Sequence, residues 1–227
     1  MQNAGGGKSG ELPITNQEGK PVESNTLLLV LGTRNAHKAQ ELQELFAPLQ
    51  LEIKTLADFP QAVDVAEDAF TFAENAEKKA VEQARHLGQW VLGEDSGLVV
   101  DALGGAPGPR SARFAGPQAT DEENNQKLLR ELEGVPPEKR TAAYVCHMVV
   151  ADPQGEVRAR QEARCRGRIT TTPRGTAGFG YDPLFEIIEY HRTFGELGLL
   201  VKQRLSHRAR ATERLLVQLR HLLLEQR

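Results

Sequence analysis

GEDSGLVVDALGGAPGPRSARFAG, residues 93–116, decides how the rest of the chain is interpreted. Two adjacent carboxylates, Glu94 and Asp95, follow the apolar residues of a predicted strand at 89–93, and a glycine-rich stretch follows them. A buried carboxylate without a partner is costly, and it often takes up a proton instead of staying charged. The sequence therefore predicts either an exposed loop or a cation site at the end of this strand.

Strand patterns and helix patterns alternate on both sides of this segment. Short apolar runs predict strands at 26–32, 51–56, 89–93 and 183–188, and a strand pair at 140–170. Helical spacing and capping residues predict helices at 39–47, 72–87, 120–132 and 206–227. This alternation predicts an α/β fold with helices flanking a central mixed sheet.

The composition limits the class of protein. The chain has 227 residues, of which 39% are hydrophobic, and a formal net charge of −3. That charge argues against a protein that coats nucleic acid or anionic membranes, and no apolar run approaches the length of a membrane span. Residues 1–25 are polar and rich in glycine, which predicts a disordered tail ahead of a single domain at 26–227. We expect a cytoplasmic protein without nucleic-acid or membrane partners.

The two cysteines, Cys146 and Cys165, lack the spacing of metal ligands. They lie on the two arms of the predicted hairpin, whose turn we place at 152–155. Symmetric pairing about that turn sets Cys146 opposite Gln161. The sequence therefore predicts two free, buried thiols and no disulfide.

Two segments carry groups suited to binding phosphate. In TRNAHK, residues 33–38, a strand leads into a helix start, where free N–H groups favour anions and Lys38 adds a positive charge. In AEDAFTFAENAEKKA, residues 66–80, Asn75 and Lys79 share a helix face and Glu67 precedes the helix. Each segment alone is more typical of plain helix capping or of a solvated helix face than of a binding site.

The acids at 94 and 95 and a third at Glu67 form a set of hard oxygen ligands of the kind that Mg²⁺ prefers. GFGYDP, residues 178–183, adds an aromatic face at Phe179 and an acceptor at Asp182. KQRLSHRARA, residues 202–211, adds a group of donors at a helix start. Phosphate, metal and base groups together indicate a nucleoside triphosphate site.

These motifs, in this order, resemble the inosine triphosphate pyrophosphatase family, whose members hydrolyse (d)ITP and XTP to the monophosphate and pyrophosphate. The resemblance covers nearly all of residues 26–220. It implies an elongated, two-lobed α/β fold with the active site in the cleft, a bound Mg²⁺ and a homodimer.

The resemblance also assigns residues to roles. Asp95 would be the proton acceptor and a Mg²⁺ ligand, Glu67 the second metal carboxylate, and Lys79 would neutralise charge near the scissile phosphate. Glu94 stands beside Asp95 in the catalytic group, although many members carry Asp there. The substrate-binding residues at the phosphate end would be Thr33, Arg34, Asn35, Ala36, His37, Lys38, Asn75 and Ser96. Those at the purine end would be Phe179, Gly180, Tyr181, Asp182, Lys202, His207 and Arg208.

Two other classes stay open at this point. One is a pyrophosphatase for modified pyrimidine nucleotides on a similar scaffold. The other is a nucleic-acid-binding module that uses the arginine-bearing arm of the hairpin and the basic last helix. The purine-end motifs count against the first, and the acidic net charge and few aromatics count against the second.

Overall fold

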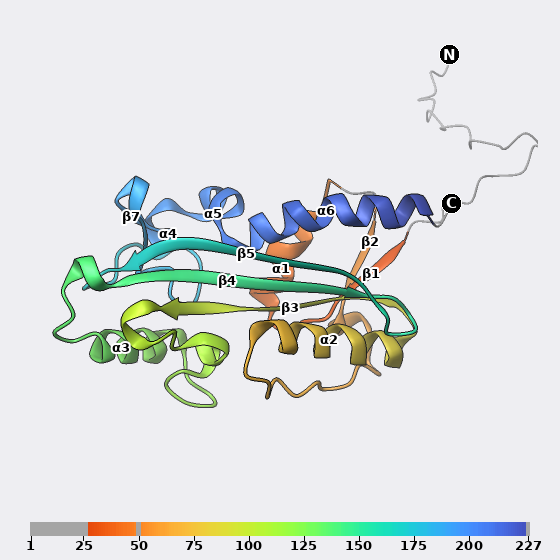
Figure 1. Ribbon diagram of the computed structural model, residues 1–227, viewed down its shortest axis with the longest axis horizontal. Helices are drawn as coiled ribbons and strands as arrows, with labels where there is room; N and C mark the ends of the chain where they lie inside the picture. The colour runs from red at the N-terminus through yellow and green to blue at the C-terminus, as the bar shows by residue number, and fades with distance from the viewer. Residues whose placement is uncertain (1–26, 49–50, 226–227) are drawn as a thin grey trace, which may run out of the picture.

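A computed structural model describes residues 27–48 and 51–225. The predicted tail at 1–25 lies outside these residues. Seven strands form one sheet in the order β2-β1-β3-β4-β5-β6-β7, and three of them run the length of an elongated molecule (Figure 1). None of the helices formed by the described residues is both long and apolar enough to cross a bilayer.

The strands are β1 (Leu28–Leu31), β2 (Glu52–Thr55), β3 (Trp90–Val100), β4 (Thr141–Ala151), β5 (Val157–Ile169), β6 (Phe185–Ile187) and β7 (Arg192–Thr193). The α-helices are α1 (Ala36–Phe46), α2 (Phe72–Leu87), α3 (Asp121–Glu131), α4 (Phe194–Leu197), α5 (Leu199–Leu205) and α6 (His207–Glu225). Short 3₁₀ turns are η1 (Leu56–Asp58), η2 (Asp101–Leu103), η3 (Gly108–Arg113), η4 (Pro137–Lys139) and η5 (Ile188–Tyr190).

The sheet is mixed, as the sequence predicts. β1 pairs in parallel with β2 and with β3, whereas every pair from β3 to β7 is antiparallel. One hydrophobic cluster fills the space between the sheet and the helices α1 and α6, and a second lies between the opposite face and α2. A third cluster, built on the far halves of β3 to β5 with α3, forms the core of the other end of the molecule. The predicted α/β fold with flanking helices is confirmed.

β3 corrects the prediction for residues 89–93. The strand continues to Val100, so that Glu94 and Asp95 lie in its middle and do not end it. The strand extends because residues 91–100 pair without interruption with β4. Since neighbouring side chains of a strand point to opposite faces, the two like charges are separated by the sheet itself.

The hairpin of β4 and β5 has a different register from the predicted one. Cys146 lies opposite Ala163, whereas Gln161 pairs with Met148. The difference arises because the connection is longer than a four-residue turn and the ladder is irregular at Val150 and Ala151. Both cysteines are nevertheless buried and free, as predicted.

The helix ends follow local sequence signals. α2 has the predicted bounds, begins at a capping box of Thr71 and Glu74, and ends at Gly88, whose φ is 62°. α1 begins three residues earlier than predicted, because Asn35 caps it by accepting a bond from the Lys38 N–H. The short helix α5, which holds Lys202, is not predicted by the sequence pattern.

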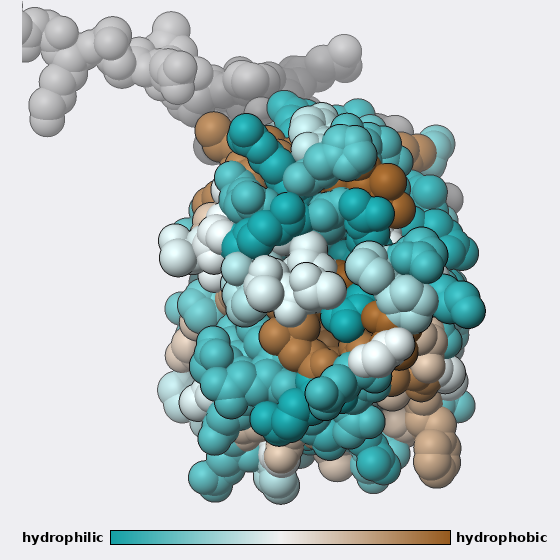
Figure 2. Space-filling model, turned by 90° about the vertical axis from the view of Figure 1, so that its left-hand side faces the viewer, coloured by the Kyte–Doolittle hydropathy of each residue, from teal (hydrophilic) through white to brown (hydrophobic). Residues whose placement is uncertain are grey.

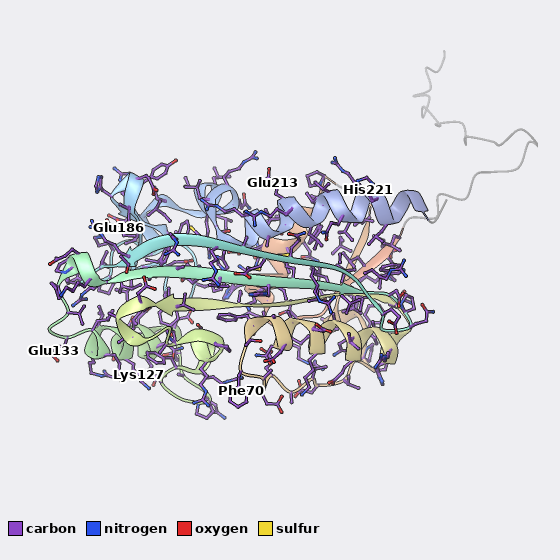
Figure 3. All side chains as sticks on the ribbon, viewed as in Figure 1. Phe70, Lys127, Glu133, Glu186, Glu213 and His221 are labelled. Carbon is purple, nitrogen blue, oxygen red and sulfur yellow. The ribbon has the colours of Figure 1, made fainter. Side chains whose placement is uncertain are left out.

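The face of the molecule shown in Figure 2 is mainly polar. The end of the molecule near α3 and β7 has a hydrophilic rim around a small recess with apolar residues (Figure 2). Glu213 and His221 project from the outer face of α6, and Phe70 points away from the sheet just before α2 (Figure 3). Phe70 is 92% exposed.

Gly93 is the point at which α2 packs on β3, and its replacement by alanine tests that packing. A Cβ there would lie 2.1 Å from the backbone oxygen of Ala76 and 2.6 Å from the backbone nitrogen of Ala80. We expect Gly93→Ala to lower the free energy of unfolding by about 3 kcal/mol, measured by urea unfolding, because the helix must move away from the strand. A variant as stable as the wild type would show that the two backbones are not in such close contact.

Candidate active site

A cleft opens where β1 ends and β3 continues. β1 pairs with β3 only as far as Leu31 and Leu92, after which the chain bends into α1, and this edge of β3 meets another described backbone segment again only at Val99, which bridges to Pro107. α1 covers one face of the sheet and α2 the other, so this is a switch point of the kind at which open α/β sheets bind ligands. The cleft has a volume of about 220 Å³ and opens to solvent.

The start of α1 forms one wall of the cleft. Asn35 caps the helix, and its own N–H donates to the Thr33 hydroxyl over 3.2 Å. The Lys38 ammonium lies one turn into the helix, 3.3 Å from a carboxylate oxygen of Glu94. Exposed N–H groups at a helix start, a hydroxyl and an ammonium together make an anion-binding site.

The Asp95 carboxylate faces α2, and two side chains of that helix donate hydrogen bonds to it. Its Oδ1 accepts from the Lys79 ammonium over 3.2 Å and its Oδ2 from the Asn75 amide over 3.1 Å. Lys79 also lies 3.2 Å from a carboxylate oxygen of Glu67. Burial raises the pKa of Asp95, and the neighbouring ammonium offsets this only in part. Burial alone would lower the pKa of Lys79, but the two carboxylates raise it above its ordinary value.

Glu94 faces the opposite side of the sheet. Its carboxylate lies 3.0 Å from the Arg208 guanidinium of α6 and also contacts Lys38. Burial would raise the pKa of Glu94, but Arg208 and Lys38 together hold it well below its ordinary value. The two adjacent acids therefore have different partners and shifts of opposite sign.

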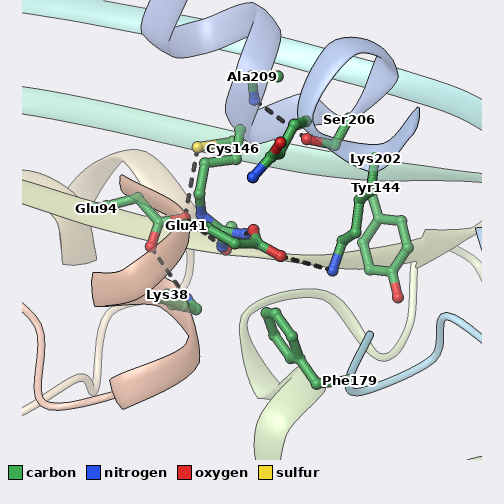
Figure 4. Close-up of polar contacts among 12 residues, drawn as sticks. Lys38, Glu41, Glu94, Tyr144, Cys146, Phe179, Lys202, Ser206 and Ala209 are labelled. Atoms are coloured by element: carbon green, nitrogen blue, oxygen red, sulfur yellow. Dashed lines mark hydrogen bonds and ion pairs between the residues drawn. The ribbon is translucent and has the colours of Figure 1, made fainter. Parts of the chain in front are cut away.

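The other end of the cleft is built around Lys202 (Figure 4). Its ammonium lies 2.6 Å from Asp182 and 2.9 Å from Glu41, and it stands 4.0 Å from the centre of the Phe179 ring. The exposed His37 ring stacks against Phe179 at 5.2 Å. An aromatic ring, a cation and a carboxylate at one place suit the recognition of a flat heterocycle.

His207 and Arg208 begin α6 behind this group. The His207 ring stacks on Tyr144 at 4.8 Å, and its Nδ1 is buried without a hydrogen-bond partner. Burial and the Arg208 charge lower the pKa of His207 well below its ordinary value, so the imidazole is neutral. The terminal nitrogens of Arg208 donate to Glu41, Glu94 and Ser96, so this guanidinium is mainly occupied by the protein.

The structure brings together most of the residues that the sequence predicts. The predicted residues that line the cleft are Thr33, Arg34, Asn35, Lys38, Glu67, Lys79, Asp95, Ser96, Phe179, Gly180, Tyr181, Asp182, Lys202, His207 and Arg208. Four predicted residues, Ala36, His37, Asn75 and Glu94, contact this set without lining the cleft themselves.

Several cleft residues are missed by the sequence reasoning. Arg113 lines the cleft and donates to the backbone oxygen of Glu67. Asn124 and Asn125 of α3 hold two loops of the cleft through hydrogen bonds to backbone groups of residues 112, 115 and 180. An Asn pair inside a helix, where Asn is a poor helix former, is the signal that could have revealed them.

The cleft offers carboxylate oxygens that a divalent ion could bind. Within residues 27–48 and 51–225, no three His, Cys, Asp or Glu side chains gather as they do in an all-protein metal site. Glu67 and Asp95 contact the same ammonium and line the same cleft. Two carboxylates with space for water and phosphate oxygens fit Mg²⁺, which rarely uses a full protein cage.

Comparisons with known proteins agree with this geometry. The Ham1 family model matches residues 29–218. A dITP/XTP pyrophosphatase of Rhodopirellula baltica is 55% identical, covering 86% of this chain and 93% of the relative. One from Geobacillus kaustophilus is 51% identical, covering 82% and 91%.

Solved structures show the same similarity. The structure of a HAM1 protein from Coxiella burnetii has a TM-score of 0.79 and 36% identity, covering 86% of this chain and all of the neighbour. A nucleoside-triphosphatase / dITP/XTP pyrophosphatase from Mycobacterium abscessus has a TM-score of 0.70 and 38% identity, covering 84% and 99%. The chain belongs to the Ham1 family.

Proposed function

We propose that this chain is a Mg²⁺-dependent nucleoside triphosphate pyrophosphatase that converts ITP, dITP, XTP and dXTP to the monophosphate and pyrophosphate. Such an enzyme removes non-standard purine nucleotides from the nucleotide pool. The observation that carries the proposal is one cleft in which the Asp95–Lys79–Glu67 group, the start of α1 and the Phe179–Lys202 pair all meet. The relatives named dITP/XTP pyrophosphatase support the same substrate class.

Asp95 is the proposed proton acceptor for a water that attacks the α-phosphorus. Its raised pKa makes it a stronger base than an ordinary carboxylate, and Asn75 and Lys79 fix both of its oxygens. The Lys79 ammonium lies beside the site of charge development on the scissile bond. Glu67 and Asp95 are the proposed ligands of Mg²⁺, which when bound neutralises phosphate charge and stabilises the leaving pyrophosphate.

The triphosphate is proposed to lie along the start of α1. Thr33, Asn35 and Lys38 supply a hydroxyl, backbone N–H groups and a positive charge there, and Ser96 stands on the facing strand. Glu94 acts indirectly in this proposal, by holding Lys38 and Arg208.

The purine is proposed to bind between Phe179 and the start of α6. Hypoxanthine and xanthine carry an acceptor at O6, where adenine carries an amino donor. The first N–H groups of a helix have no intrahelical acceptor, and those of His207 and Arg208 can donate to O6. A buried site of this kind rejects an amino group because donors would face donors.

The pairing of the β5 arginines with carboxylates argues against the alternative of a nucleic-acid-binding module. The arginines on β5 lie mainly on the exposed face, and four pair with carboxylates: Arg158 with Asp152, Arg160 with Glu77, Arg164 with Glu162, and Arg168 with Glu186. Arginines neutralised in this way contribute little to phosphate-backbone binding. The homodimer that the resemblance implies and the cytoplasmic location that the sequence predicts stay predictions.

A nucleotide panel tests the proposed function. With ITP, XTP and ATP compared at equal concentration, we expect kcat/KM for ITP and XTP to exceed that for ATP by about 10²-fold or more. Pyrophosphate release should require Mg²⁺ and be abolished by a chelator. Equal rates on ATP and ITP would contradict the purine site, and release of inorganic phosphate instead of pyrophosphate would contradict attack at the α-phosphorus.

Asp95→Asn tests the proton acceptor. The amide keeps the shape of the side chain but cannot take up the proton, so we expect kcat to fall by about 10²- to 10⁴-fold. Circular dichroism should show an unchanged fold. Asp101→Asn is the matched control, since Asp101 is exposed, lies just beyond the same strand, and binds the Thr141 hydroxyl. Near-normal turnover in Asp95→Asn would remove Asp95 from the mechanism.

The neutral state of His207 is tested by NMR. Because burial and Arg208 lower its pKa, the ring should show no titration between about pH 5.5 and pH 8. A ¹⁵N spectrum of the imidazoles, with His207 assigned from a His207→Gln variant, measures this. A His207 signal that moves with a midpoint inside that interval would mean that the ring is charged at the purine end.

A further inference from the structure

Glu41 is a buried carboxylate that contacts two residues of the cleft and that neither the sequence motifs nor the proposed mechanism uses. It lies on α1, one turn after Lys38, and is 7% exposed. Its Oε1 is 2.9 Å from the Lys202 ammonium, and its Oε2 accepts from Nη1 of Arg208. One side chain therefore joins two cations from two different helices.

Each of the two cations that Glu41 contacts also contacts other side chains of the site. Lys202 also contacts Asp182 and stands over the Phe179 ring. Arg208 also donates to Glu94 and to the Ser96 hydroxyl. The Glu41 carboxylate thus pulls Lys202 toward α1 while Asp182 holds it from the other side, and this sets where the ammonium stands above the ring.

The charged side chains linked through Glu41 form a group with equal numbers of positive and negative charges. Lys38, Lys202 and Arg208 are positive, and Glu41, Glu94 and Asp182 are negative. Without the charge on Glu41, Lys202 would keep only Asp182 and Arg208 only Glu94 as a carboxylate partner. The two cations would then repel each other across a neutral group, and each would move toward its remaining partner. The movement would affect the purine end first, because Asp95, Lys79 and Glu67 belong to a separate group on the opposite face of the sheet.

We propose that Glu41 is a positioning residue that sets the affinity for the purine by holding Lys202 over Phe179 and Arg208 at the start of α6. The inference rests on the proposed function. It predicts that Glu41 affects binding of the base and not binding of the polyphosphate or the chemical step.

The test compares Glu41→Gln with Glu44→Gln. Glu44 lies on the same helix, is exposed, and contacts the glutamines Gln40 and Gln203, so it controls for loss of a charge from α1. We expect Glu41→Gln to raise KM for ITP by about tenfold or more, with kcat changed less than about threefold. The ITP preference over ATP should fall, and Glu44→Gln should match the wild type.

Two binding probes separate the ends of the site. Calorimetry with inosine monophosphate should show about tenfold weaker binding to Glu41→Gln, whereas inhibition by inorganic tripolyphosphate should stay within about twofold of the wild type. Unchanged affinity for inosine monophosphate would overturn the inference. An equal loss of tripolyphosphate binding would also overturn it, because Glu41 would then support the whole fold.

A second variant, Glu41→Asp, provides the test if Glu41→Gln does not fold. It retains the charge but withdraws the carboxylate by one methylene, so it should fold and still weaken inosine monophosphate binding several-fold. A Glu41→Asp variant with wild-type affinity would contradict the positioning role. A wild-type protein that does not hydrolyse ITP would instead contradict the proposed function.

Discussion

A chain of six side chains of alternating charge crosses the interior, and the site depends on its staying paired. In order, the members are Lys38, Glu94, Arg208, Glu41, Lys202 and Asp182. They come from α1, β3, α5, α6 and the loop before β6 (Figure 4). An ionised group buried without a partner costs several kcal/mol, so each member is tolerated because its neighbours are present. None of these elements can shift alone without unpairing a charge.

The sheet supplies the second constraint. β1 stops while β3 runs on, and this leaves backbone open at the place where α1 begins. The alternation of side chains along β3 then sends Glu94 to the face covered by α1 and α6, and Asp95 to the face covered by α2. Two adjacent acids can both stay charged there because the sheet lies between them and each has its own cations.

The same separation gives the two acids different properties. Arg208 and Lys38 lower the pKa of Glu94 despite its burial, whereas burial raises the pKa of Asp95 despite Lys79. Acidic groups whose environments push their pKa values apart are suited to different roles. In the proposed function, Asp95 takes up a proton while Glu94 stays ionised and keeps two cations in place.

The sequence by itself determined the features that depend on near neighbours in the chain. The bounds of α2, the caps at Asn35 and Ser206, and the four motifs that meet in the cleft follow from spacing and from local hydrogen bonds. Pairing between distant segments was decided only by the tertiary structure. The extension of β3 through its two acids needs β4 as a partner, and the role of Glu41 needs cations more than 150 residues away. From the helix pattern alone, a carboxylate such as that of Glu41 is expected to be solvated, because the distant residues that pair with it contribute nothing to the local pattern.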